Sequence, residues 1–436
     1  MSAAQTFLAE RGIVGDATVE QVRYDVDEHG AIVRLGARDE LATIPFAPRV
    51  RDYGRALVLP GFVNAHSHAF QRAIRGATHV RERAQSNFWS WRTAMYRAAN
   101  ELDPQRLFTI TRLAFAEMLR AGITCVGEFH YVHHRPDGQP YDDSNELSWQ
   151  IVRAAQDVGI RLVLLEVFYE RAGAGAPALP EQRRFCDRDV DAYLARLSAL
   201  RARGVDVGIA PHSVRAVGRD ALARLAEHAR AESLPLHVHV SEQPRENAEC
   251  IAEHGCSPTQ LLESLGFCAR AHGFTAVHAI HLDDADRRAL AGQQVCVCPT
   301  TEADLGDGLV GARELREHDV GFAIGSDSNA VIDAIQEVRL LEMGERLRTG
   351  QRICFGDEHR ELAHALLDVG TRGGARALGC AARRGTLRVG ADFDAAVVDL
   401  SAHLFAAAGD ALTTLLATGT ASAVSHVIVG GQERVP

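Results

Sequence analysis

The sequence has 436 residues, of which 46% are hydrophobic and 24% charged, an ordinary globular balance with enough length for a large core. Its formal net charge of −10 argues against nucleic acid as a partner, since a nucleic-acid-binding protein is expected to have a basic face. No stretch approaches the roughly 18 apolar residues of a membrane helix, and the first residues lack the basic start and apolar run of a signal peptide, so we expect no membrane partner.

The middle of the chain alternates apolar runs with amphipathic helical segments, an order typical of a parallel sheet. Eight runs read as strands: 57–65, 123–129, 161–168, 207–211, 234–240, 275–280, 294–298 and 321–325. Residues 107–121, 220–231 and 283–291 read as helices, the first with Asp103 as its predicted cap. This pattern predicts an α/β fold, a closed (β/α)8 barrel of TIM type, with the active site at the carboxyl ends of the strands.

The two ends of the chain do not follow this rhythm, since they are short, turn-rich and strand-like. We predict that they pair into a small β-sandwich beside the barrel. The expected domain organisation is a sandwich built from residues 1–56 plus 380–436 and a barrel built from residues 57–379.

The chain has nine cysteines and no CxxC pair, and most of them lie in apolar segments. Free buried thiols in a reducing cytoplasm explain this better than disulfides. Cys296 and Cys298 alternate with valines in a predicted strand, so we interpret them as core residues rather than metal ligands.

Histidine pairs follow two of the predicted strands. His66 and His68 come directly after the first strand, and side chains two residues apart on an extended chain face the same side. His237 and His239 repeat this spacing on the fifth strand. Two neutral imidazoles that face one point can bind a metal ion. Glu242 has the opposite parity, so it joins them only if the chain has already turned.

Further polar residues follow the other strands. His278 and His281 lie at the end of the sixth strand, Asp327 follows the eighth, and His212 follows the fourth. Each signal alone also fits a core histidine, a surface charge or an ordinary turn. Their joint occurrence at the ends of strands one, four, five, six and eight indicates one site.

Together these residues resemble the amidohydrolase superfamily, in its cytosine deaminase-like branch. The resemblance covers nearly the whole chain, including the closing strands in 385–400. It implies four metal ligands, His66, His68, His239 and Asp327, around one divalent ion per subunit, with zinc as the first choice and iron or manganese as alternatives. It implies that Glu242, His278 and Asp327 are catalytic, with His278 chosen over His281, whereas we interpret His237 as structural.

The implied reaction is hydrolysis of a C–N bond. A single metal would activate water, Asp327 and His278 would handle the attacking group, and Glu242 would protonate the departing nitrogen. The sequence contains no lysine, which excludes the subtype that holds two metals with a carboxylated lysine.

Four stretches, HSHAFQRA, FWSWR, GEFHYVHH and APHSVRA, are similar to members of the branch that deaminate a linear dicarboxylate amidine. The resemblance implies five substrate contacts: Gln71, Arg92, Tyr131, His212 and Arg215. Two arginines at the mouth of an acidic protein favour a small anionic substrate, because guanidinium binds carboxylate bidentately.

Other interpretations stay open. One is another deaminase of the branch, acting on guanine, a pterin or an adenosine derivative. A second is a metal-free scaffold relative, which is disfavoured because all four ligands are present. Analogy also suggests a homodimer. Asn329 stands where many relatives carry histidine, and it can bond but not titrate near neutral pH.

Overall fold

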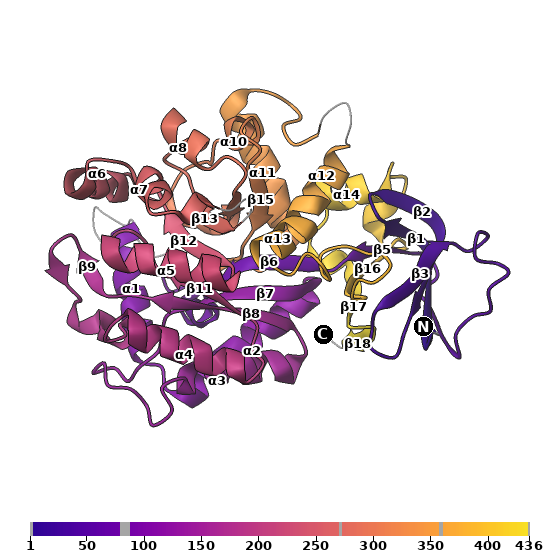
Figure 1. Ribbon diagram of the computed structural model, residues 1–436. Coiled ribbons are helices and arrows are strands. Elements are labelled where there is room, and N and C mark those ends of the chain that lie inside the picture. The colour runs from indigo at the N-terminus through magenta and orange to yellow at the C-terminus, as the bar shows by residue number, and fades with distance from the viewer. Residues whose placement is uncertain (1–2, 79–87, 270–272, 357–360, 435–436) are drawn as a thin grey trace.

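The computed structural model describes residues 3–78, 88–269, 273–356 and 361–434. In this part of the chain, parallel strands close into a barrel (Figure 1). Its members are β6 (Phe62–Ser67), β7 (Ile123–His130), β8 (Arg161–Phe168), β11 (Val207–Pro211), β12 (Leu236–Val240), β13 (Phe274–His278), β14 (Gln294–Val297) and β15 (Gly321–Ile324). Seven of these strands match predicted runs closely, β6 matches only the second part of the first run, and the predicted barrel is confirmed.

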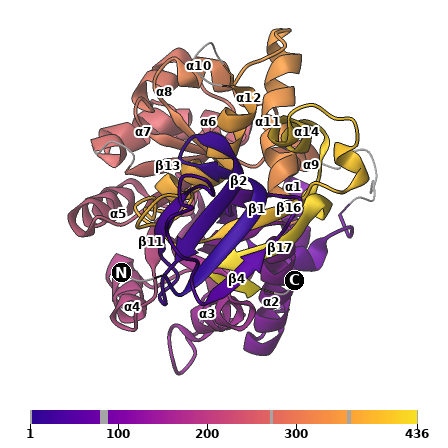
Figure 2. The same ribbon diagram turned by 90° about the vertical axis from the view of Figure 1, so that its right-hand side faces the viewer.

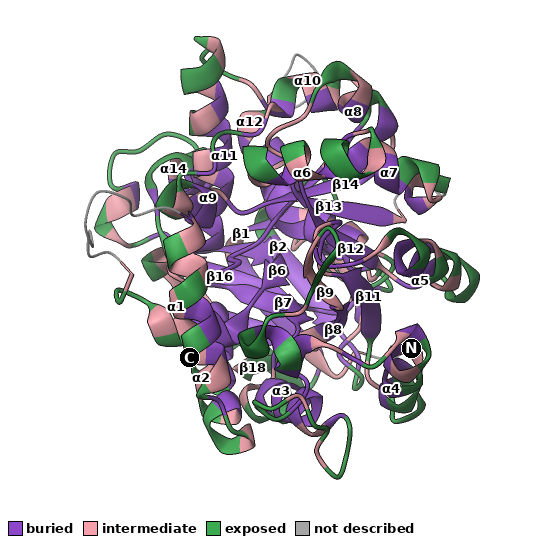
Figure 3. Cartoon of the chain, turned by 90° about the vertical axis from the view of Figure 1, so that its left-hand side faces the viewer, coloured by how far each residue is buried: buried purple, intermediate pink, exposed green. Residues whose placement is uncertain are grey.

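Helices surround the barrel, with their outward faces exposed and the strands buried inside (Figure 3). They are α1 (Phe88–Asn100), α2 (Pro104–Arg120), α3 (Glu146–Val158), α4 (Val190–Ala202), α5 (Arg219–Glu232), α6 (Pro244–His254), α7 (Pro258–Ser264), α8 (Asp284–Ala289), α9 (Pro299–Leu305), α10 (Ala312–Arg316), α11 (Ala334–Thr349), α12 (Leu362–Asp368), α13 (Gly374–Ala377) and α14 (Ala411–Thr418). The three predicted helices correspond to α2, α5 and α8. Asp103 caps α2 as predicted, because its side chain accepts a hydrogen bond from the Arg106 amide.

Strands from both ends of the chain form a second sheet (Figure 2). These strands are β1 (Gln5–Val14), β2 (Ala17–Val26), β3 (Ile32–Ala37), β4 (Arg49–Asp52), β5 (Ala56–Pro60), β16 (Ala395–Asp399), β17 (Val424–Val429) and β18 (Gln432–Arg434). The pairing of the two ends is confirmed where β16 runs antiparallel to β5. A hydrophobic cluster that includes Phe7, Tyr24 and Phe393 forms the core of this part of the chain, and it is separate from the barrel core.

The predicted first strand, 57–65, is wrong as a single element. It divides at Gly61 into β5, which belongs to the terminal sheet, and β6, which belongs to the barrel. The Gly61 amide donates to Asp394 of the terminal segment, and the next amide, of Phe62, donates to Gly122. A Cβ atom at Gly61 would lie 2.2 Å from Thr124 Oγ1, so only glycine fits at the division. The exact domain boundaries stay a prediction.

The terminal sheet lies at the amino ends of the barrel strands. Arg161, the first residue of β8, forms an ion pair with Asp394 just before β16. The carboxyl ends of the barrel strands, where the predicted site residues lie, therefore face away from this sheet.

Candidate metal centre and active site

Three histidines converge at the carboxyl end of the barrel. His66 and His68 lie at the end of β6, and His239 lies on β12. The Nε2 atom of His66 is 3.2 Å from that of His68 and 3.1 Å from that of His239. All three side chains are buried, and their ligand atoms are close enough to hold one metal ion.

The orientation of these rings suits metal binding. The Nδ1–H group of His68 donates to the Phe129 carbonyl, and that of His239 donates to the His212 carbonyl, each over 2.9 Å. These bonds leave the Nε2 lone pairs free to face one another. Burial lowers the pKa of all three histidines, to about 3 for His66, so the rings are neutral and able to coordinate.

Asp327 completes the group from the end of β15. Its Oδ1 atom lies 3.3 Å from His68 Nε2 and 3.6 Å from His66 Nε2. Burial opposes ionisation of this carboxyl, but the neighbouring imidazoles outweigh burial and lower its pKa. Three imidazoles and one carboxylate form a donor set that fits a zinc-like ion with an open position.

Backbone bonds hold Asp327 against the histidine strand. Its amide donates to the His66 carbonyl, and its own carbonyl accepts from the His68 amide. Asn329 is fully buried, and its side-chain amide donates to the Asp327 carbonyl and to Ser67 Oγ. Asn329 therefore holds the backbone of Asp327 close to Ser67, the residue between His66 and His68.

A second row of polar groups surrounds His278. Its Nε2 atom lies 3.7 Å from Glu242 Oε1 and 3.8 Å from Asp327 Oδ2. Burial alone would lower the pKa of His278, but Glu242 and the other nearby carboxylates raise it well above its usual value. Burial raises the pKa of Glu242. The structure thus brings all three residues predicted to be catalytic together.

Glu302 belongs to this row and was missed by the sequence analysis. Its Oε1 atom lies 3.2 Å from His278 Nδ1 and accepts a hydrogen bond from the Cys298 amide. Glu302 lies in α9, directly after β14, which is the seventh predicted strand. The sequence analysis proposed no site residue after that strand. Cys298, Glu302 and His278 also lie within metal-binding reach of one another, although Cys298 itself is a buried free thiol.

Two of the predicted substrate contacts form one buried pair. Gln71 Nε2 donates to the Tyr131 hydroxyl over 2.9 Å. The Tyr131 ring lies against His68 and His212, with centroids 5.1 and 5.6 Å away. His212 in turn lies 4.9 Å from the His239 ring, so these residues line one side of the candidate metal centre.

The two predicted arginines meet around Trp89. The Arg92 guanidinium lies 4.5 Å from the Trp89 ring centroid and that of Arg215 lies 5.9 Å away. Burial and the charge of Arg215 lower the pKa of Arg92. One buried nitrogen of each guanidinium, Nη1, finds no hydrogen-bond partner among the described residues. Arg245, which the sequence analysis missed, lies 4.5 Å from the same ring.

The other histidines of the motif take different positions. His237 Nε2 donates to the Ala377 carbonyl beneath the candidate metal centre, as expected of a structural residue. The His281 amide donates to the Ser241 carbonyl. In the described part of the chain, His281 Nε2 has no hydrogen-bond partner.

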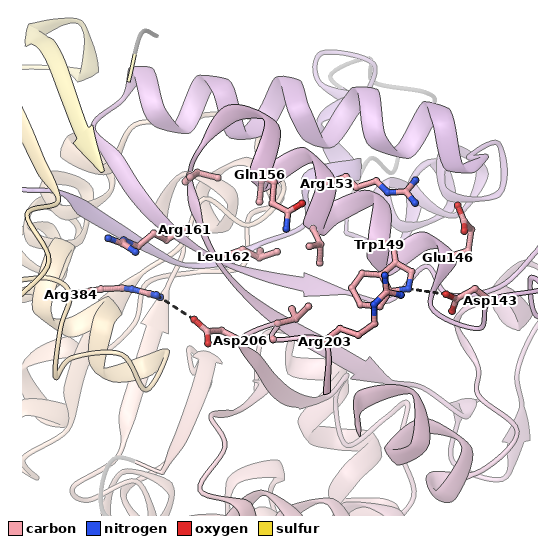
Figure 4. Close-up of a pocket in the computed structure, with 15 residues that line it drawn as sticks. Asp143, Glu146, Trp149, Arg153, Gln156, Arg161, Leu162, Arg203, Asp206 and Arg384 are labelled. Carbon is pink, nitrogen blue, oxygen red and sulfur yellow. Dashed lines mark hydrogen bonds and ion pairs between the residues drawn. The ribbon is translucent and has the colours of Figure 1, made fainter. Parts of the chain in front are cut away.

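A cavity of about 470 Å³ lies elsewhere, between α3 and the amino ends of β8 and β11 (Figure 4). Trp149, Arg153 and Arg203 line it, and Arg384 pairs with Asp206 at one side. None of the predicted site residues is among the residues that line it. No helix in the described ranges is long and apolar enough to cross a membrane.

A closed parallel barrel with three imidazoles and a carboxylate at its carboxyl end defines the class of metal-dependent barrel hydrolases. Residues 57–434 match the model of the amidohydrolase family. The chain therefore belongs to the amidohydrolase family.

Individual relatives agree with this assignment. The chain is 38% identical to a formimidoylglutamate deiminase of Pseudomonas aeruginosa, over 97% of this chain and 93% of the relative. It is 29% identical to an 8-oxoguanine deaminase of the same organism, over 94% and 89%. Among solved structures, an amidohydrolase of Brucella melitensis superposes with a TM-score of 0.88 at 33% identity, covering 99% of this chain and 94% of that one. A zinc-bound adenosine deaminase of Xanthomonas campestris gives 0.83 at 25% identity, over 99% and 92%.

Proposed function

We propose that this chain hydrolyses N-formimino-L-glutamate to N-formyl-L-glutamate and ammonia, a reaction of histidine degradation, with one zinc ion in the site formed by His66, His68, His239 and Asp327. The deiminase of Pseudomonas aeruginosa, whose name states this type of reaction, supports the proposal. The observation that carries it is the pair Arg92 and Arg215: each has a buried nitrogen without a partner among the described residues, and both lie close enough to His212 for their charges to add to burial in lowering its pKa.

The substrate matches these groups in charge. It carries an amidine on its α-nitrogen, an α-carboxylate on the adjacent carbon and a γ-carboxylate at the far end of the side chain. Arg92 and Arg215 can each offer a charge-assisted hydrogen bond to a carboxylate. Both guanidinium groups lie near the Trp89 ring, and burial together with their charges lowers the pKa of His212. The Tyr131 ring, bonded to Gln71, packs against His212 and against His68 of the candidate metal centre. This arrangement would direct the amidine carbon toward the candidate metal centre.

The reaction converts the C=NH group of the amidine into C=O, and both protons of the water end on the nitrogen, which leaves as ammonia. When bound, the ion would lower the pKa of water and so supply a nucleophile at neutral pH. Asp327 accepts a proton from the attacking water, and His278, held by Glu242 and Glu302, stabilises the attacking group. Because burial raises the pKa of Glu242, this residue can carry a proton and pass it to the nitrogen that leaves as ammonia.

An ammonia-release assay after reconstitution with Zn²⁺ tests the proposal. N-formimino-L-glutamate, 5′-methylthioadenosine, guanine, 8-oxoguanine and a pterin are supplied in parallel, because relatives of lower identity carry the names of purine and adenosine deaminases. We expect ammonia from N-formimino-L-glutamate alone. Release from one of the ring compounds and none from the linear amidine would assign the chain to another deaminase of the branch.

A further inference from the structure

A second cluster of buried ligand groups lies outside the barrel wall. His130, His133 and Glu166 each offer a ligand atom, and these atoms lie within 4.8 Å of one another. His130 and Glu166 are neighbours in register on β7 and β8. The Phe129 ring contacts His66 and His239 inside the barrel, so the next side chain, His130, points to the opposite face of the strand.

The helices close this space from outside. Ser148 of α3 donates to Glu166 Oε1 over 2.6 Å, and Arg196 of α4 donates to Glu166 Oε2 over 2.9 Å. Arg196 also forms a two-bond pair with Asp187. Figure 1 shows α3 and α4 together on the side of the barrel that β7 and β8 form. The cluster is thus separated by the strands from the candidate metal centre.

Once the hydrogen bonds of His133 are assigned, its Nδ1 atom and Glu166 Oε2 face one another as two acceptors. The Nε2–H group of His133 donates to the Val167 carbonyl over 2.8 Å, which places the ring proton on Nε2. His133 Nδ1 then directs a lone pair toward Glu166 Oε2, 3.5 Å away. Neither His133 Nδ1 nor His130 Nε2 has a hydrogen-bond partner within the described ranges. Buried acceptors that face each other are unfavourable unless a proton or a cation lies between them.

The histidines are poor sources of that proton. Burial, followed by the charge of Arg196, lowers the pKa of His130 to about 3 and that of His133 well below its usual value. Burial raises the pKa of Glu166, and the charge of Arg196 opposes that increase. A proton held by Glu166 is therefore the alternative to a cation between these atoms.

We propose that His130, His133 and Glu166 bind a second divalent cation per chain, separate from the centre formed by His66, His68 and His239. Two imidazoles and a carboxylate form a donor set suited to zinc. Because two of the three ligands, His130 and His133, lie in the segment 130–133, the ion fixes the end of β7 against Glu166 of β8. That segment includes Tyr131, and the preceding residue, Phe129, supplies the carbonyl that orients His68. The role of this ion is structural.

Zinc stoichiometry tests the proposal without any assay of activity. The chain is stripped with a chelator, dialysed against Zn²⁺ and freed of unbound ion, and zinc per chain is measured by mass spectrometry. We expect two ions in the wild type, one in His133→Gln and one in His239→Ala. The glutamine amide keeps the donor to the Val167 carbonyl. His134→Gln is the matched control, because His134 contacts Asp187 and lies outside the trio, and it should retain two ions.

Thermal unfolding gives a second measurement. In His239→Ala, where the barrel centre has lost a ligand, added Zn²⁺ should still raise the Tm, and the added change His133→Gln should abolish that rise. The proposal is overturned if the wild type binds one zinc ion and His239→Ala binds none. In that case Glu166 and His133 share a proton and bind no metal. If His133→Gln does not fold, the count in the wild type and in His239→Ala still decides between two sites and one.

Discussion

Replacement of Arg215 by methionine tests the origin of substrate binding. The change removes a guanidinium with a partly unsatisfied buried nitrogen and keeps most of the apolar stem. A hydrogen bond to a charged group contributes about 1.5–3 kcal/mol. At about 1.4 kcal/mol per tenfold change, kcat/KM for N-formimino-L-glutamate should fall by about 10- to 150-fold. The charge of Arg215 also lowers the pKa of Arg92, so its removal relieves a repulsion between the two arginines. The expected decrease in kcat/KM therefore lies toward the lower end of this range.

On the proposed function, the loss should lie in KM, because Arg215 would bind a part of the substrate that does not react. Initial rates of ammonia release are measured together with zinc content, which should match the wild type. Arg153→Met is the control, since Arg153 is exposed beside the cavity of Figure 4 and its replacement changes the net charge equally. If KM in Arg215→Met equals that of the wild type while zinc is retained, the assignment of a dicarboxylate substrate is refuted.

Three further predictions concern the supports of the site and of the terminal sheet. Gly325→Ala places a Cβ atom 2.7 Å from His66 Cβ, so zinc content and activity should both fall. Glu302→Ala should lower kcat about 10- to 100-fold by releasing His278, Glu302→Gln should restore part of it, and equal loss in both variants would contradict a positioning role. Asp25→Asn breaks a buried pair with two arginines and should destabilise the fold by about 3–5 kcal/mol in chemical unfolding. Burial opposes ionisation of Asp25, but hydrogen bonds from the arginines lower its pKa, so its stabilising effect is complete above about pH 4 and disappears as the pH falls further.

The sequence predicted the barrel because its two strongest signals agree. Apolar runs mark buried parallel strands, and polar residues directly after them mark one common edge. His66, His68 and His239 could be assigned to the inside of the barrel from alternation along single strands. The assignment of Asp327 required only the position of a strand end, and its carboxylate lies 3.6 Å from His66 and 3.3 Å from His68.

The features that were missed depend on contacts between distant segments. The run 57–65 is apolar throughout, so its composition does not reveal that Gly61 divides it between two sheets. Glu302 and Arg245 each lie in the first turn or turns of a helix, where a charged residue is usually exposed, and only the packed barrel brings them to the site. The stretch HYVHH was read for Tyr131 alone, because the partner carboxylate, Glu166, is supplied by the next strand.

Backbone conformation adds an argument for the site that is independent of side-chain chemistry. In the described residues, nine residues other than glycine have a positive φ, and five of them, Ser241, His278, Ala279, Asp327 and Asn329, lie at the carboxyl ends of β12, β13 and β15. Such conformations cost on the order of 1–3 kcal/mol each and persist only where the surrounding structure imposes them. Asp, Asn and His occur in this region more often than other residues with a side chain, whereas Ala279 (φ 53°) belongs to a type that rarely adopts it. The Ala279 amide donates to the Val277 and Val240 carbonyls, and these bonds hold the turn at His278 (φ 71°), where its side chain meets Glu242 and Glu302.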